Sequence, residues 1–434
     1  MDIFLAILIV IGLGLLSSGR LTYRLRRSRL MVVLLSGGWL AIFVGMLLGP
    51  NFFPLIGVTE AETTLVSPRA LLESTPLLMM GLGWIGVMVG LQLRWEVIRS
   101  LSAGIWKVLL ADTALSVLLF GGVALVGVSL WTDANALAPI WPAVLLLTAG
   151  SIGWSMETRS LRMAATTETD ERLDTLIRAT GALGGVLAVT VLGLGYKFVT
   201  RDADGTFVFD LTGAIGRAAL IGVLAVLVGL LGRFAIGLAG KDRGHQLVVF
   251  LGIVVFVAGV ATQLDLPPVF AAMLTGIILV NLKGNSIEGF EKFIVKAEFT
   301  VATMFALLAG ILLDPRIGMP GLAIALVIAL ARILIKPVFT RWLARRTHRQ
   351  EPPFPMDSPL FLGTARQHPI FLALAVSVVL LEPSAFNARL LTVVILSGLL
   401  CELLPIFARP GSSRSPVQEN SPAARGTPTQ GAPA

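Results

Sequence analysis

A few ionisable side chains interrupt long apolar stretches of this chain, and they are its strongest candidates for chemistry. Asp112 lies among apolar neighbours, and Arg332 and Lys336 stand four residues apart in a later apolar run. His368 lies at the start of another, and an unperturbed imidazole titrates near about 6.5, which suits a proton carrier. A charged group inside a bilayer costs at least about 2.5 kcal/mol, so these residues are candidates for an ion or proton pathway.

Each of these residues also has a structural explanation. Arg332 and Lys336 would then snorkel, with their charged ends at the cytoplasmic face of the membrane. Asp112 would only pair with Lys107 near that face, and His368 would cap a helix. The sequence leaves both explanations open.

Two apolar stretches are interrupted by glycine and polar residues. One spans Leu147–Gly153 and contains Thr148 and Ser151, and the other spans Thr364–Pro369. Backbone groups released at such interruptions need protein or water as partners, because lipid offers none. Two interruptions in corresponding halves of a chain indicate a transporter site at the bilayer midplane. The alternative is that the small residues allow close helix packing.

The elements that must position these groups are membrane-spanning helices. The chain has 434 residues, of which 55% are hydrophobic and only 14% charged, whereas a soluble protein carries about 25% charged residues. Apolar runs of about twenty residues recur, and each would span a hydrocarbon core of about 30 Å. We therefore predict an all-α polytopic membrane protein with about thirteen transmembrane helices. This excludes a soluble enzyme, a secreted disulfide scaffold and a disordered chain. The predicted spans are Ile3–Ser18, Met31–Leu48, Leu72–Leu93, Ile105–Leu130, Trp141–Met156, Thr175–Phe198, Thr212–Leu238, Gln246–Gln263, Val269–Leu282, Glu298–Leu313, Met319–Pro337, His368–Leu381 and Ala388–Ala408.

Basic residues are concentrated in alternate joints between these spans. Such an excess of Lys and Arg marks the cytoplasmic side, so we expect the N-terminus outside and the C-terminus inside a bacterial cytoplasmic membrane. The net charge of +8 then reflects membrane orientation rather than binding to nucleic acid. The basic joints contain, among others, Arg24, Arg99, Arg162, Lys292 and Arg345.

The chain divides into one transmembrane domain, residues 1–408, and a cytoplasmic tail, residues 409–434. The tail is rich in Pro, Ser, Gly and Ala and is predicted to be disordered. A single cysteine, Cys401, and three scattered histidines predict neither a disulfide nor a metal site. The sequence contains no phosphate loop and no nucleophile arrangement, so we expect no enzymatic activity and no cofactor.

The chain contains five short motifs: Gly45–Pro50, Val89–Leu93, Leu264–Gly276, Phe305–Gly310 and Cys401–Pro405. In their order and spacing they resemble the monovalent cation:proton antiporters, and among them the Kef-type sodium/hydrogen exchanger branch. That resemblance implies an inverted-repeat fold of about thirteen helices with two broken, crossing helices, a moving core bundle and a dimerisation bundle. It also implies a homodimer that exchanges Na⁺ or K⁺ for H⁺ at an aspartate of the sixth helix. Lys336 stands where many relatives carry a basic residue facing that aspartate.

The sixth span departs from this family pattern. Gly184 and Gly185 stand where the family carries its site carboxylate, and no carboxylate occurs between Asp174 and Asp202. A hard cation prefers oxygen ligands, and charged ones are favoured. The remaining candidate ligands in this region are backbone carbonyls and the hydroxyl groups of Thr148, Ser151 and Thr180.

Three functions remain open from sequence. The first is a secondary transporter that exchanges a monovalent cation for protons, with Asp112, His368 or another group replacing the lost carboxylate. The second is an antiporter fold that has lost exchange and serves as a sensor, partner subunit or leak. The third is carriage of an organic anion attracted by Arg332 and Lys336.

Overall fold

The protein is almost entirely helical in the residues that the structure, a computed structural model, describes. These residues are 38–52, 73–101, 103–131, 137–152, 171–196, 198–201, 207–239, 243–264, 266–282, 301–347 and 370–407. The helices are α4 (Trp39–Leu48), α7 (Thr75–Leu91), α8 (Trp95–Ser100), α9 (Ala103–Trp131), α10 (Leu137–Ile152), α12 (Glu171–Gly195), α13 (Leu211–Leu238), α14 (Arg243–Gln263), α15 (Pro268–Asn281), α17 (Gly318–Thr347), α19 (Ile370–Leu381) and α20 (Ala385–Phe407). A further helix covers Val301–Leu312.

Five of the described helices are long and apolar enough to cross a membrane: Ala103–Trp131, Leu211–Leu238, Gly244–Gln263, Gly318–Leu343 and Ala385–Leu403. Shorter apolar helices accompany them, and together they form a multi-pass membrane protein. Every predicted span after the first overlaps a described helix. The spans Met31–Leu48, Trp141–Met156, Glu298–Leu313 and His368–Leu381 each begin or end among residues that the structure does not describe. The first span, Ile3–Ser18, and the predicted tail, 409–434, lie outside the described residues, so the total of thirteen spans stays a prediction.

The predicted all-α class holds for the described residues apart from one short hairpin. Between α12 and α13, β1 (Val199–Arg201) and β2 (Phe207–Phe209) pair in antiparallel register, with Val199 opposite Phe209. These short segments consist largely of β-branched and aromatic residues, which fit a pleated surface better than a helix. The strands were not predicted, because the predicted sixth span extends to Phe198 and no structure was assigned to the polar joint that follows it.

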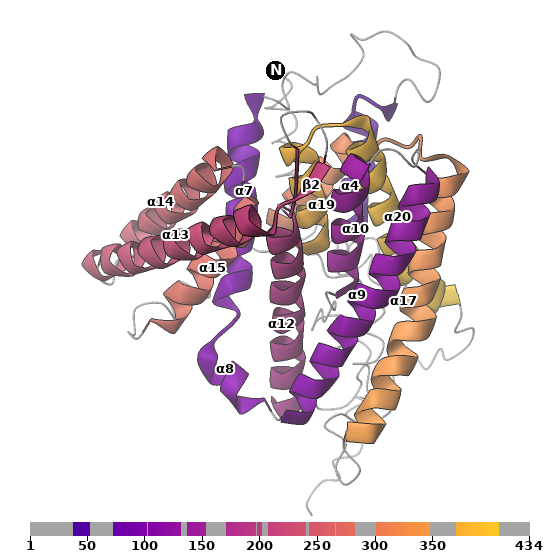
Figure 1. The fold of residues 1–434 in the computed structure, drawn as a ribbon. Coiled ribbons are helices and arrows are strands. Elements are labelled where there is room, and N and C mark those ends of the chain that lie inside the picture. The colour runs from indigo at the N-terminus through magenta and orange to yellow at the C-terminus, as the bar shows by residue number, and fades with distance from the viewer. Residues whose placement is uncertain are drawn as a thin grey trace, which may run out of the picture.

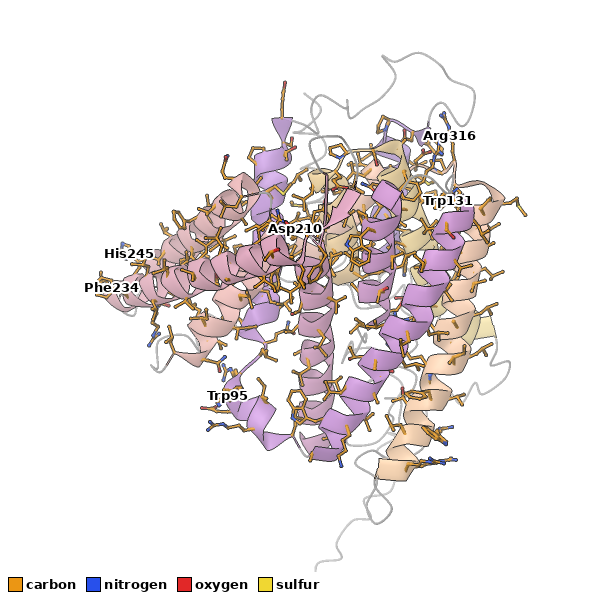
Figure 2. The ribbon with its side chains drawn as sticks, viewed as in Figure 1. Trp95, Trp131, Asp210, Phe234, His245 and Arg316 are labelled. Atoms are coloured by element: carbon orange, nitrogen blue, oxygen red, sulfur yellow. The ribbon has the colours of Figure 1, made fainter. Side chains whose placement is uncertain are left out.

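The helices form two groups on either side of α12 (Figure 1). On one side α7 and α15 pack together, with α13 and α14 against them, and on the other side α9 and α17 run side by side. The helix α10 contacts α9, α12, α19 and α20, so its side chains lie inside the second group. Figure 2 shows Trp131 and Arg316 at one end of the molecule and Trp95 at the other.

Glycines set the closest helix contacts of the first group. A Cβ atom built at Gly90 of α7 would overlap the Met273 carbonyl oxygen of α15, and one at Gly276 would lie 2.5 Å from the Val87 carbonyl oxygen. The same arrangement joins α4 to the helix over Val301–Leu312 through a glycine from each helix. Small residues therefore let these backbones touch, which is the packing role expected of glycine in membrane helices.

Candidate functional site

The two basic residues of α17 are completely buried. Arg332 and Lys336 both have an exposed fraction of 0%. They stand one turn apart and therefore share a face of the helix, which packs against α9 and α20. The alternative explanation that they snorkel does not hold, because both side chains are buried between helices and bond to groups of α10 and α9.

Both cations donate hydrogen bonds to the last carbonyl groups of the described α10. Arg332 Nη1 lies 2.6 Å from the Gly150 oxygen, and Lys336 Nζ bonds to the Ser151 oxygen. The Ile152 oxygen lies 3.5 Å from the same ammonium. The carbonyl end of a helix carries a partial negative charge, so two buried cations at this end of α10 are favourably placed.

A buried carboxylate completes the cluster. Asp112 of α9 has an exposed fraction of 1%, and its Oδ2 atom lies 3.2 Å from Lys336 Nζ. The hydroxyl of Thr340, one turn after Lys336, donates to Asp112 Oδ1 at 3.1 Å. The expected pairing of Asp112 with Lys107 is therefore replaced by a long-range pair, and Lys107 is exposed.

The hydroxyl of Ser116 extends the cluster along α9. It stands one turn after Asp112 and donates to the Ser151 carbonyl oxygen at 3.3 Å. Ser116 and Thr340 were not predicted as site residues, although a signal was available. Each follows a candidate charged residue by four positions, which places it on the same helix face.

These charges balance one another only in part. A buried ion pair is stable when its geometry is good and its remaining donors and acceptors are satisfied, as they are around Asp112 and Lys336. With Arg332 included, the three ionisable side chains carry one more positive than negative charge when all are ionised. The partial negative charge at the end of α10 offsets the excess.

The predicted hydroxyl ligands of α10 bond within their own helix. Thr148 Oγ1 donates to the Val144 oxygen at 2.6 Å, and Ser151 Oγ donates to the Leu147 oxygen at 2.8 Å. Such back-bonding lets serine and threonine sit inside a helix, and α10 is helical through Ile152, where an interruption was expected. Residues 153–170 lie outside the described residues.

The ends of α10 and α19 meet inside the bundle. A Cβ atom built at Gly150, near the end of α10, would overlap the ring of Phe371, the second residue of α19. Both residues belong to the two helices predicted to cross, and the helices are in contact. The second predicted interruption, Thr364–Pro369, lies outside the described residues, and so does His368. Whether both helices are broken stays a prediction.

The remaining predicted residues lie on α12. Gly184 and Gly185 are buried in this helix, which packs against α10 and α9. Thr180 belongs to the same helix, but its side chain is not among those described. Glu402, in the last turns of α20, accepts a hydrogen bond of 2.7 Å from the indole of Trp39, a contact that joins α20 to α4. Among the described residues, no group of three or more His, Cys, Asp or Glu side chains could hold a metal ion.

Comparisons with known proteins support the fold. No protein-family model matches the chain, and no curated protein matches it. Its structure is similar to that of the sodium proton antiporter MjNhaP1 from Methanocaldococcus jannaschii, with a TM-score of 0.61 and 14% sequence identity over 94% of this chain and 99% of that chain. The protein therefore has the fold of a sodium proton antiporter.

Proposed function

We propose that this protein is a secondary transporter that exchanges a monovalent cation, Na⁺ or K⁺, for protons across a bacterial cytoplasmic membrane. The observation that supports it best is the buried ion pair of Asp112 and Lys336, located where α10 ends inside an antiporter fold. An ionisable pair inside a membrane protein is costly, and a proton or ion pathway is its usual role.

The chemistry of this pair can couple the two ions. Asp112 accepts from Lys336 and Thr340, and a cation that binds the carboxylate would displace the ammonium group. Oxygen ligands are available beside it from the Ser116 and Thr340 hydroxyls and the Ser151 carbonyl. Lys336, deprived of its carboxylate, would release its proton to the side of the membrane from which the cation entered, and it would take up a proton on the other side when the cation leaves. One cation bound and one proton released then keep the charge of the site unchanged.

Transport in everted membrane vesicles tests this proposal. A pH gradient is established, and its dissipation after addition of NaCl or KCl is followed with a pH-sensitive dye over a range of pH. We expect the wild type to dissipate the gradient, and Asp112→Asn and Lys336→Gln to abolish or strongly reduce the effect.

The matched control is Asp314→Asn. Asp314 is also buried, with an exposed fraction of 7%, and pairs with Arg389 at 3.2 Å, far from the cluster. This variant should transport like the wild type. Equal loss in all three variants would point to misfolding, and full activity of Asp112→Asn in correctly folded protein would exclude Asp112 as the exchanging group.

The second candidate function is an antiporter fold without exchange, acting as a sensor, partner subunit or leak. It is favoured by the glycines at positions 184 and 185 and by the excess positive charge of Arg332 and Lys336, which opposes cation entry. A wild type that shows no cation-induced dissipation with either ion at any pH would support this function. The anion carrier has less support, because both cations already bond to carbonyl oxygens.

The remaining expectations are the homodimer, the N-terminus outside and the C-terminus inside. The positive-inside pattern supports the orientation. Crosslinking in native membranes would test the homodimer, and the accessibility of a cysteine introduced after residue 409 would test the position of the C-terminus.

A further inference from the structure

The outer face of α17 carries a shallow apolar groove that the exchange site does not use. Its volume is about 420 Å³, and it is lined by Leu334, Ile335, Val338, Phe339 and Trp342. These residues follow one face of the helix, and all but the half-buried Phe339 are exposed, with Val338 at 68% and Leu334 at 60%. The groove lies on the face of α17 opposite to the one that carries the buried Lys336 and Thr340.

The groove ends where α17 leaves the apolar part of the membrane. A helix of 30 residues is about 45 Å long, whereas the hydrocarbon core is about 30 Å thick. Its last turns therefore reach the headgroup region, where tryptophan is commonly found. This end of α17 lies at the same end of the molecule as Trp95, opposite Trp131 and Arg316 (Figure 2).

Arginine side chains stand at this end of the groove. The guanidinium group of Arg346 lies 4.4 Å from the centre of the Trp342 ring, and Trp342 in turn contacts Phe339 with ring centres 5.8 Å apart. Arg345 and Arg346 are both exposed. Stacking on tryptophan holds the planar guanidinium in place, and its fork of donors matches phosphate oxygens.

We propose that this groove binds an anionic phospholipid, with an acyl chain along Leu334–Trp342 and the headgroup phosphate at Arg345 and Arg346. An apolar channel along a single helix that ends in two cations is complementary to one acyl chain and one anionic headgroup. A partner protein would require an interface of about 1,000 Å² or more, and this narrow groove offers much less. The inference depends on the membrane embedding of α17 and not on the proposed exchange.

The bound lipid would also contact the segment that holds the buried pair. Pro337, inside α17, cannot donate a backbone hydrogen bond, so the helix is weakest between the groove's two ends. Thr340, which bonds to Asp112, belongs to the turn after this proline. A lipid that spans the groove would therefore stabilise the helix on both sides of Pro337.

Thermal unfolding of the purified full chain in a neutral detergent tests the proposal. The probes are phosphatidylglycerol and phosphatidylcholine, added separately, together with glycerol 3-phosphate as a headgroup without acyl chains. A ligand that binds only the folded state raises the unfolding temperature as its concentration increases. We expect phosphatidylglycerol alone to raise it.

The variant Arg345→Gln/Arg346→Gln should weaken phosphatidylglycerol binding about 25-fold, at about fivefold for each arginine near a membrane surface. The matched control is Arg99→Gln, because Arg99 stacks on Trp95 of α8 at 5.2 Å and lies outside this groove. It should bind like the wild type, whereas Trp342→Ala should lose binding. An equal shift with phosphatidylcholine, an equal shift with glycerol 3-phosphate, or unchanged binding by the double arginine variant would each overturn the proposal.

Discussion

The buried pair of Asp112 and Lys336 predicts a strong energetic coupling between α9 and α17. At the observed 3.2 Å, with an effective dielectric constant of about 20, two unit charges attract each other by about 5 kcal/mol. Removing one partner of a buried pair usually costs about 3–5 kcal/mol, because the other charge stays buried. Lys336 keeps its carbonyl partners on α10, so we expect Asp112→Asn to cost about 3 kcal/mol, at the lower end of that range.

A double-mutant cycle with Lys336→Met measures this coupling. The free energy of unfolding would be determined for the wild type, both single variants and the double variant by titration with a denaturing detergent in mixed micelles. Because the double variant removes both charges of the pair, it should cost well below the sum of the single variants, with a coupling of about 2 kcal/mol or more. The matched cycle at Asp314 and Arg389 should give a coupling below about 1 kcal/mol, because Arg389 is 41% exposed. Additivity at Asp112 and Lys336 within about 0.5 kcal/mol would refute the structural pairing.

Three further predictions concern packing and capping. Gly150→Ala should destabilise the protein by about 1–3 kcal/mol in the same unfolding assay, since its Cβ atom would overlap the Phe371 ring, and Phe371→Leu should restore part of the loss. Gly90→Ala should destabilise the contact of α7 with α15. The control is Gly122→Ala, whose Cβ atom meets open space and which should be neutral or stabilising by up to about 1 kcal/mol. Equal effects of the two variants would contradict the close approach at Gly90. Asp210 caps α13 by accepting a hydrogen bond from the Gly213 amide at 2.7 Å. Asp210→Ala should therefore lower the free energy of unfolding by about 1 kcal/mol and speed the exchange of that amide proton with solvent. Asp210→Asn should retain most of the cap.

The spans could be predicted from sequence because membrane helices are specified locally. Twenty apolar residues must form a helix in lipid whatever their neighbours are, so hydrophobic length alone locates the helix. The ends of the helices were predicted less well than their positions: the predicted span was Trp141–Met156, whereas α10 covers Leu137–Ile152. A two-stranded hairpin depends on pairing between separate segments, and the polar joint after the sixth span gave no periodic signal for it.

The partner of Asp112 could not be predicted, because it depends on how α9 packs against α17. One error was avoidable, however. Lys107 and Asp112 are five residues apart, so they point to different faces of one helix and would not meet. The residue on the same face as Asp112 is Ser116, which the structure places in the cluster. Helical spacing thus carries information on which polar residues share a face, but not on which helix that face contacts.

The position of Asp112 offers a physical account of how the glycines at 184 and 185 can be tolerated. A cation buried at Lys336 needs a carboxylate close by, but the requirement is for charge and distance, not for a particular helix. Both α9 and α12 pack against α10, and Lys336 bonds to the end of α10. A carboxylate on either helix could therefore lie close to Lys336. Asp112 meets this requirement from α9, with Thr340 and Lys336 satisfying its oxygens. An acidic partner for Lys336 therefore does not require a carboxylate on α12.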